Sequence, residues 1–286
     1  PHLAFVDPRR NDDMPGMVGS ARRLVALFRA RGVGAEKIII SIPATEDGVS
    51  AAKALEAEGI HTNLILVAGL MHAAVCAQAG ATAISIAVGP LLQFHERKRK
   101  TDYHEFKPEA HPGIEVIQAT LEYFKLHEIR TRLVGRDFRQ LAELSALPGF
   151  DAVCLSKEQL LEAARYLVDL DRTGPPQHQA SMRARQAQHP SRLLEQLDAF
   201  MQLLSGAARR TLAAQLYPAL GRMELQMAGI ELAVREEVVW QLAVKTTDLA
   251  GLYDALRGTP PSSPKKLKKT RRTGDCEAAA SESLPA

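Results

Sequence analysis

The chain has 286 residues, of which 46% are hydrophobic and 24% charged, values typical of a globular protein with a sizeable core. Its apolar runs are too short to cross a bilayer, so we expect no membrane segment. The chain has 36 basic and 33 acidic residues, and six of the basic and three of the acidic ones lie in residues 258–286. Residues 1–257, the body of the chain, therefore contain 30 basic and 30 acidic residues. A neutral body argues against a nucleic-acid-binding face on the globular part.

The three cysteines, Cys76, Cys154 and Cys276, are widely spaced and show neither metal-binding nor redox spacing. This usage is typical of a reducing compartment, so we expect a cytoplasmic protein. The N-terminus does not read as a signal peptide. Because the chain begins with Pro1 and continues directly into an apolar stretch, we expect the protein to start further upstream.

Six apolar segments rich in β-branched residues are predicted as strands. The segments are HLAFVD (2–7), KIIISI (37–42), TNLILVA (62–68), ATAISIAVG (81–89), RTRLVG (130–135) and FDAVCLS (150–156). Amphipathic segments between them are predicted as helices, over residues 16–32, 46–59, 70–80 and 113–128. This alternation predicts a parallel sheet covered by helices, although a closed barrel of this kind needs eight strands.

The pattern changes after the sixth strand. We divide the chain into an α/β part (1–173), a polar linker (174–190), a helical region (191–257) and a tail (258–286). In the helical region, apolar residues recur at helical spacing, as at Leu193, Leu197, Phe200, Leu203 and Leu204. The tail consists largely of Pro, Ser, Lys and Ala, which cannot form a packed core, so we predict that it is disordered.

Several colinear segments of the α/β part resemble the transaldolase family. The matching segments are VDPRR (6–10), KIIISIPATEDGVSAAKALEAEGIHTNLILV (37–67), CAQAGATAISIAVGPLLQFHERKRK (76–100) and VGRDFRQLAELSALPGFDAVCLSKEQL (134–160). The resemblance implies a TIM-type (β/α)8 barrel in which the six strands are the third to the eighth. The first two strands are then missing from this chain. A shortened sequence is favoured over an open sheet, because an open sheet would leave two unpaired edges.

The family's chemistry uses a lysine that forms a Schiff base with a ketose, and the resemblance places Ser41 at that position. Other family positions are also changed: a glutamate falls on Phe5, a threonine on Ile65 and a phosphate-binding arginine on Pro90. The resemblance retains the predicted substrate-binding and phosphate-binding residues Asp7, Thr45, Asn63, Ser85 and Arg139, where Arg139 stands at the family's phosphate-binding arginine.

No other lysine lies at the C-terminal end of a predicted strand, where barrel enzymes keep their chemistry. Lys37 is at the opposite, N-terminal end of its strand. Lys157 is explained more simply as a surface residue at the start of a helix. Ser41 could instead be a nucleophile, but no histidine is placed by the sequence to activate it. We therefore predict that Ser41 is non-functional as a catalytic residue.

Three further sequence patterns each allow a functional interpretation and a purely structural one. His95, His104 and His111 share one polar loop, but their spacing matches no metal-ligand pattern, so we predict no metal and no cofactor. The run ERKRK (96–100) is either a solvated face or a polyanion site. The basic tail is either an ordinary disordered segment or a nuclear-import signal.

The sequence thus predicts a transaldolase-like barrel protein that binds a sugar phosphate and lacks normal dihydroxyacetone transfer. Two alternatives stay open. The first is a barrel enzyme repurposed for chemistry without an imine, and the second is a non-catalytic scaffold. In the second, the helical region binds a protein partner or a second copy of the chain.

Overall fold

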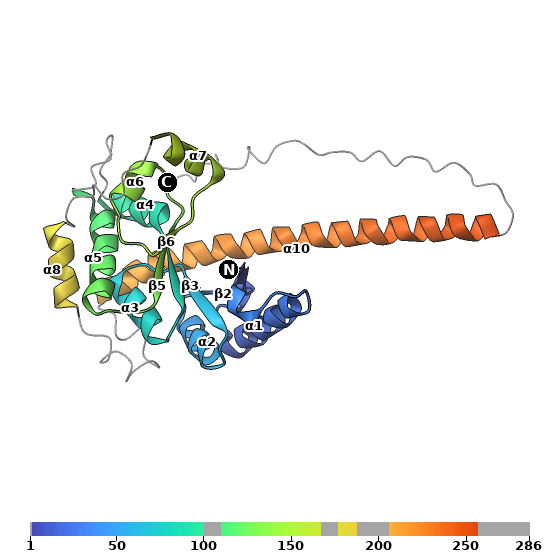
Figure 1. The fold of residues 1–286 in the computed structure, drawn as a ribbon, viewed down its shortest axis with the longest axis horizontal. Helices are drawn as coiled ribbons and strands as arrows, with labels where there is room; N and C mark the ends of the chain where they lie inside the picture. The colour runs from blue at the N-terminus through green and yellow to red at the C-terminus, as the bar shows by residue number, and fades with distance from the viewer. Residues whose placement is uncertain (1, 100–109, 167–176, 188–205, 257–286) are drawn as a thin grey trace, which may run out of the picture. The chain divides into compact units, whose positions relative to one another are not determined.

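The computed structural model describes residues 2–99, 110–166, 177–187 and 206–256 (Figure 1). Its six strands confirm the six predicted ones and pair in parallel, in the order of the chain. The sheet curls as part of a barrel. The strands are β1 (His2–Phe5), β2 (Ile38–Pro43), β3 (His61–Ile65), β4 (Ala83–Ala87), β5 (Arg132–Arg136) and β6 (Ala152–Val153).

Helices follow the strands and cover the sheet (Figure 1). Short 3-10 turns form at η1 (Pro8–Arg10) and η2 (Ala35–Lys37). The helices are α1 (Met14–Arg29), α2 (Glu46–Ala57), α3 (Leu70–Gln78), α4 (Val88–Arg99), α5 (Pro112–Leu126), α6 (Leu141–Ser145), α7 (Lys157–Tyr166), α8 (His178–Gln186) and α10 (Gly206–Leu256).

Local sequence explains where the helices begin and end. The Thr45 hydroxyl caps α2 by accepting the N–H of Gly48 at 3.0 Å. Gly59 and Gly80 follow α2 and α3 with φ of 74° and 82°, a left-handed conformation that glycine adopts without strain. These glycines turn the chain from each helix into the next strand.

The core lies between the sheet and its helices. Ile38, Ile40 and Ile42 of β2 are at most 1% exposed, and Leu55 of α2 and Tyr123 of α5 are fully buried. Each large apolar side chain removed from water contributes about 1.5–3 kcal/mol before the entropy cost is counted. The strands are therefore held mainly by apolar burial on their faces.

The sheet has two edges in the part of the chain that the structure describes. β1 pairs only with β2, and β6 pairs only with β5. Leu3 and Phe5 of β1 are 47% and 40% exposed, and Val153 of β6 is 39% exposed. The described strands therefore form an open, incomplete barrel.

The C-terminal part differs in one respect from the sequence prediction. Residues 174–190 were predicted as a linker, but His178–Gln186 form α8, which packs against α5 (Figure 1). Ala180 and Ala184 are buried there, and Arg183 pairs with Glu115 at 2.9 Å. The sequence did not predict this helix because the segment is largely polar and its buried residues are two small alanines.

The predicted helical region is found over the part that is described, as α10. Residues 191–205, with Leu193, Leu197, Phe200, Leu203 and Leu204, and the tail 258–286 lie outside the described residues. The chain divides into two units, residues 1–230 and 231–286, and the sheet belongs to the first. None of the helices described is both long and apolar enough to cross a membrane.

The Glu56 carboxylate joins the amino ends of two strands. Its Oε1 accepts the N–H of Thr62 at 2.7 Å, the Thr62 hydroxyl at 2.6 Å and the N–H of Thr82 at 2.8 Å. Its Oε2 accepts the Thr82 hydroxyl at 3.1 Å. One side chain from α2 thus satisfies the donors that open the β3 and β4 segments.

We expect Glu56→Ala to lower the free energy of unfolding by about 2 kcal/mol, because the N–H groups of Thr62 and Thr82 lose their acceptor. Urea unfolding followed by circular dichroism measures this loss. The matched control is Glu58→Ala, which removes only an exposed ion pair with Arg22 and should change stability little. Equal losses in the two variants would contradict the role of Glu56.

Candidate functional site

Three of the six predicted site residues form a hydrogen-bonded chain across neighbouring strands. Ser41 of β2 lies opposite Asn63 of β3 in the parallel register. The Asn63 amide donates to Oγ of Ser41 at 3.2 Å, and the Ser85 hydroxyl donates to Oδ1 of Asn63 at 3.0 Å. All three side chains are buried. The structure thus brings Ser41, Asn63 and Ser85 together on one face of the sheet.

The surroundings of Ser41 do not activate its hydroxyl. The buried imidazole of His72 uses its two ring nitrogens on backbone groups: Nδ1 accepts the N–H of Ala68 at 3.2 Å and Nε2 lies 2.7 Å from the carbonyl oxygen of Ala44. Since Nδ1 is an acceptor, this bonding assigns the proton to Nε2.

His72 therefore joins the loops that follow β2 and β3. Burial lowers its pKa to about 4, although the hydrogen bond to Ala44 acts in the opposite direction. A neutral imidazole fixed in this way supports the end of the sheet rather than acting as a base for Ser41.

Asp7 and Thr45 have structural partners of their own. The Asp7 carboxylate caps η1 and pairs with Arg9 at 2.6 Å, and the hydrogen bond from Arg9 lowers the pKa of Asp7. The Thr45 hydroxyl caps α2 and also donates to the carbonyl oxygen of Asn11 at 2.6 Å. Neither residue is hydrogen-bonded to the chain of Ser41, Asn63 and Ser85 by these contacts, so their role in binding stays a prediction.

The guanidinium of Arg139 is held between two carboxylates. Its Nε donates to Glu143 at 2.6 Å, and its two terminal nitrogens donate to Glu96 at 2.9 and 3.0 Å. The Arg139 N–H also donates to Glu143, which is fully buried. The hydrogen bond from Arg139 lowers the pKa of Glu96. These bonds use three of the five side-chain N–H groups of Arg139, and the two carboxylates offset its charge, which makes it a weaker attraction for a phosphate.

The described contacts of His95 and His111 do not support a metal site. His111 caps α5 and lies 3.1 Å from Glu96, and burial lowers its pKa despite that carboxylate. His95 packs edge-on against Phe94, and His104 lies outside the described residues. Across the described ranges, no three His, Cys, Asp or Glu side chains are grouped as metal ligands. Glu96, the first residue of the basic run, belongs to the Arg139 cluster.

A cavity of about 470 Å³ lies at the carboxyl ends of the strands, and we call it the mouth cavity. Residues at the ends of β1, β3, β4 and β5 form its floor, and residues 219–230 of α10 cover it. Ser85 joins the cavity to the hydrogen-bonded chain. Its lining includes Phe5, Ile65, Ser85, Pro90, Arg136, Asp137, Arg222, Met223 and Met227.

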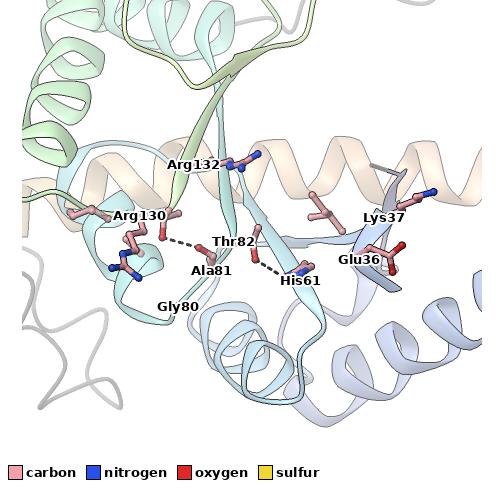
Figure 2. Close-up of a pocket in the computed structure, with 12 residues that line it drawn as sticks. Glu36, Lys37, His61, Gly80, Ala81, Thr82, Arg130 and Arg132 are labelled. Carbon is pink, nitrogen blue, oxygen red and sulfur yellow. Dashed lines mark hydrogen bonds between the residues drawn. The ribbon is translucent and has the colours of Figure 1, made fainter. Parts of the chain in front are cut away.

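A larger cavity of about 680 Å³ lies at the amino ends of the strands, as Figure 2 shows. Its basic side chains diverge, with Arg130 and Lys37 at opposite sides of the view. Its hydroxyls already have partners: Thr131 donates to the carbonyl oxygen of Ala81 at 2.8 Å, and Thr82 lies 3.0 Å from Nδ1 of His61. Because parallel barrels place their chemistry at the carboxyl ends, the mouth cavity is the better candidate site.

Known proteins resemble this chain over most of the α/β part. The family described as transaldolase/fructose-6-phosphate aldolase matches residues 4–214. A transaldolase of Nostoc punctiforme is 35% identical over 177 residues, which are 62% of this chain and 52% of that protein. A transaldolase of Schizosaccharomyces pombe is 36% identical over 151 residues, which are 53% and 46% of the two chains. The chain spans about half the length of the curated relatives it matches.

We expect Arg139→Ala to lower the free energy of unfolding by about 2 kcal/mol, because it leaves the buried Glu143 carboxylate without its cation. Thermal and urea unfolding measure the change. Arg22→Ala, which breaks only an exposed pair, is the control and should have a smaller effect. If both variants are equally stable, the Arg139 cluster does not hold the fold.

We expect stability to fall as the pH is lowered from 6.5 to 4, because unfolded His72 takes up a proton that the folded protein excludes. The depressed folded pKa of about 4 corresponds to a loss of about 3 kcal/mol across this window. Urea unfolding at several pH values measures the slope. His72→Gln should flatten it, whereas the exposed His178→Gln should not. An unchanged slope in His72→Gln would contradict this account.

Proposed function

Because the chain belongs to the transaldolase/fructose-6-phosphate aldolase family, we propose that it binds sugar phosphates at the mouth cavity without forming an imine with them. The observation that carries this proposal is the buried hydroxyl of Ser41, hydrogen-bonded to Asn63 at the position that the resemblance gives to the Schiff-base lysine. An imine requires a primary amine, and a hydroxyl cannot form one.

The placement of the predicted alternatives to that lysine supports this proposal. Lys37 precedes β2 and stands four residues before Ser41, which at strand rise is roughly 13 Å towards the amino end of the sheet. Lys157 is the first residue of α7, after β6. An amine at either place is separated from Asn63 and Ser85 by the length of a strand or by a loop.

The wall of the mouth cavity supports a changed chemistry. Phe5, Ile65 and Pro90 all line this cavity. By the resemblance, these are the three positions at which an apolar residue stands in place of a polar family residue. Their apolar side chains cannot move protons or bind phosphate. Ser85 lines the same cavity, where its hydroxyl oxygen can accept a hydrogen bond from a sugar hydroxyl, and Asn63 holds Ser85 from within the sheet.

We further propose that β1 to β6 correspond to the third to eighth strands of a (β/α)8 barrel. The parallel order of the six strands and the family match support this reading. In a longer polypeptide, two additional strands would lie between the edges of β1 and β6. The cytoplasm, where sugar phosphates are metabolised, is the compartment that this proposal implies.

A rival proposal assigns the chain a scaffold function through α10. Leu232 and Val239 stand seven residues apart on this helix and are 59% and 67% exposed. Residues with this spacing lie on one helix face, which a protein partner or a second copy could cover. The sugar-phosphate proposal is preferred because the mouth cavity contains polar groups that a purely structural scaffold does not need.

We expect no covalent adduct when the chain is incubated with fructose 6-phosphate and borohydride, because the site lacks an amine. Intact-mass spectrometry measures the product, and the transaldolase of Schizosaccharomyces pombe is the positive control. A trapped adduct on any lysine of this chain would overturn the proposal that the imine chemistry is lost. In the same preparation, calorimetry should detect reversible binding of fructose 6-phosphate; absence of binding would favour the scaffold function.

A further inference from the structure

A second cavity of about 490 Å³ lies beside the mouth cavity, between α4 and α10, and we call it the side cavity. The two cavities share the same wall at their junction, so one ligand could occupy both. The shared residues are Leu66, Ala87, Pro90, Ala219 and Arg222.

The side cavity is positively charged. Arg97 of α4 and Arg222 of α10 line it, and no acidic residue belongs to its described lining. Among the described residues, neither arginine has a carboxylate within ion-pair distance. The mouth cavity differs, because there Arg136 pairs with its neighbour Asp137 at 3.0 Å. Two guanidinium groups without acidic partners favour an anionic ligand.

Gln215 provides an independent sign of a ligand. This residue of α10 also lines the side cavity, and its side-chain Nε2 is buried without a hydrogen-bond partner in the structure. A buried amide donor without an acceptor costs free energy. A turn of the Gln215 amide towards the side cavity would let an oxygen atom bound there supply the missing acceptor.

We propose that Arg97, Gln215 and Arg222 bind the phosphate group of a sugar phosphate, an inference that rests on the proposed function. The carbon chain of this ligand would extend towards Ser85 in the mouth cavity. Arg222 stands at the junction of the two cavities and faces both. The guanidinium groups donate in pairs to phosphate oxygens, and the Gln215 amide donates to a third.

This assignment moves the phosphate away from Arg139, which Glu96 and Glu143 already neutralise. Gln215 and Arg222 lie beyond residue 214, where the family match ends. The phosphate site would therefore combine α4 of the family region with a helix that extends past it.

The test is a calorimetric titration of the full chain with fructose 6-phosphate, fructose and inorganic phosphate. Arg97→Gln and Arg222→Gln should each weaken fructose 6-phosphate binding by about 10-fold or more, because each removes a charged donor. Gln215→Leu should weaken binding without lowering stability in the absence of ligand. Arg23→Gln, an exposed arginine of α1, is the matched control and should bind like the wild type.

The outcomes separate this inference from the proposed function. If the wild type binds fructose 6-phosphate and the Arg97 and Arg222 variants bind it equally well, the phosphate site is wrong and the proposed function stands. If the wild type binds inorganic phosphate through these arginines but does not bind fructose 6-phosphate, the anion site stands and the proposed function fails. Absence of binding to either ligand overturns both.

Discussion

The register of β2 against β3 places Ser41 opposite Asn63, and the arrangement of the mouth depends on that pairing. Because strand side chains alternate between two faces, a slip by one residue would turn Asn63 away from Ser41 and Ser85. At the other end of the sheet, Glu56 holds Thr62 and Thr82 and so secures the neighbouring pairing of β3 with β4. A carboxylate at the amino ends thus helps to keep Asn63 beside Ser85 near the carboxyl ends.

Charge at the carboxyl end of the sheet is divided between two kinds of arginine. Arg139 is balanced by Glu96 and Glu143, which makes it part of the structure that connects α4 with the segment after β5. Arg97 and Arg222 have no such partners in the described chain and face a cavity. A guanidinium attracts an anion more strongly when no carboxylate of its own protein offsets its charge, and this distinction separates the two groups.

The sequence predicted the six strands because each combines β-branched residues with flanking turns, and it placed Ser41, Asn63 and Ser85 on adjacent strands. It could not predict the neutralisation of Arg139, since Glu96 comes from a helix 43 residues earlier and its contact depends on tertiary packing. The side cavity was missed for the same reason, because Arg97 and Arg222 lie 125 positions apart in the sequence and line one cavity only in the folded chain. Helix α8 was missed because two buried alanines are a weak signal within a polar stretch.

Pro218 gives α10 a property that the rest of the helix lacks. A proline inside a helix has no N–H, so the carbonyl oxygen of Ala214 has no helical donor. Both residues line the side cavity, Pro218 about one turn and Ala214 about two turns before Arg222. Because a missing hydrogen bond makes a helix easier to bend at that turn, we expect α10 to bend most readily at Pro218. Ligands of different length would then be accommodated by the tilt of one helix, while the strands keep their positions.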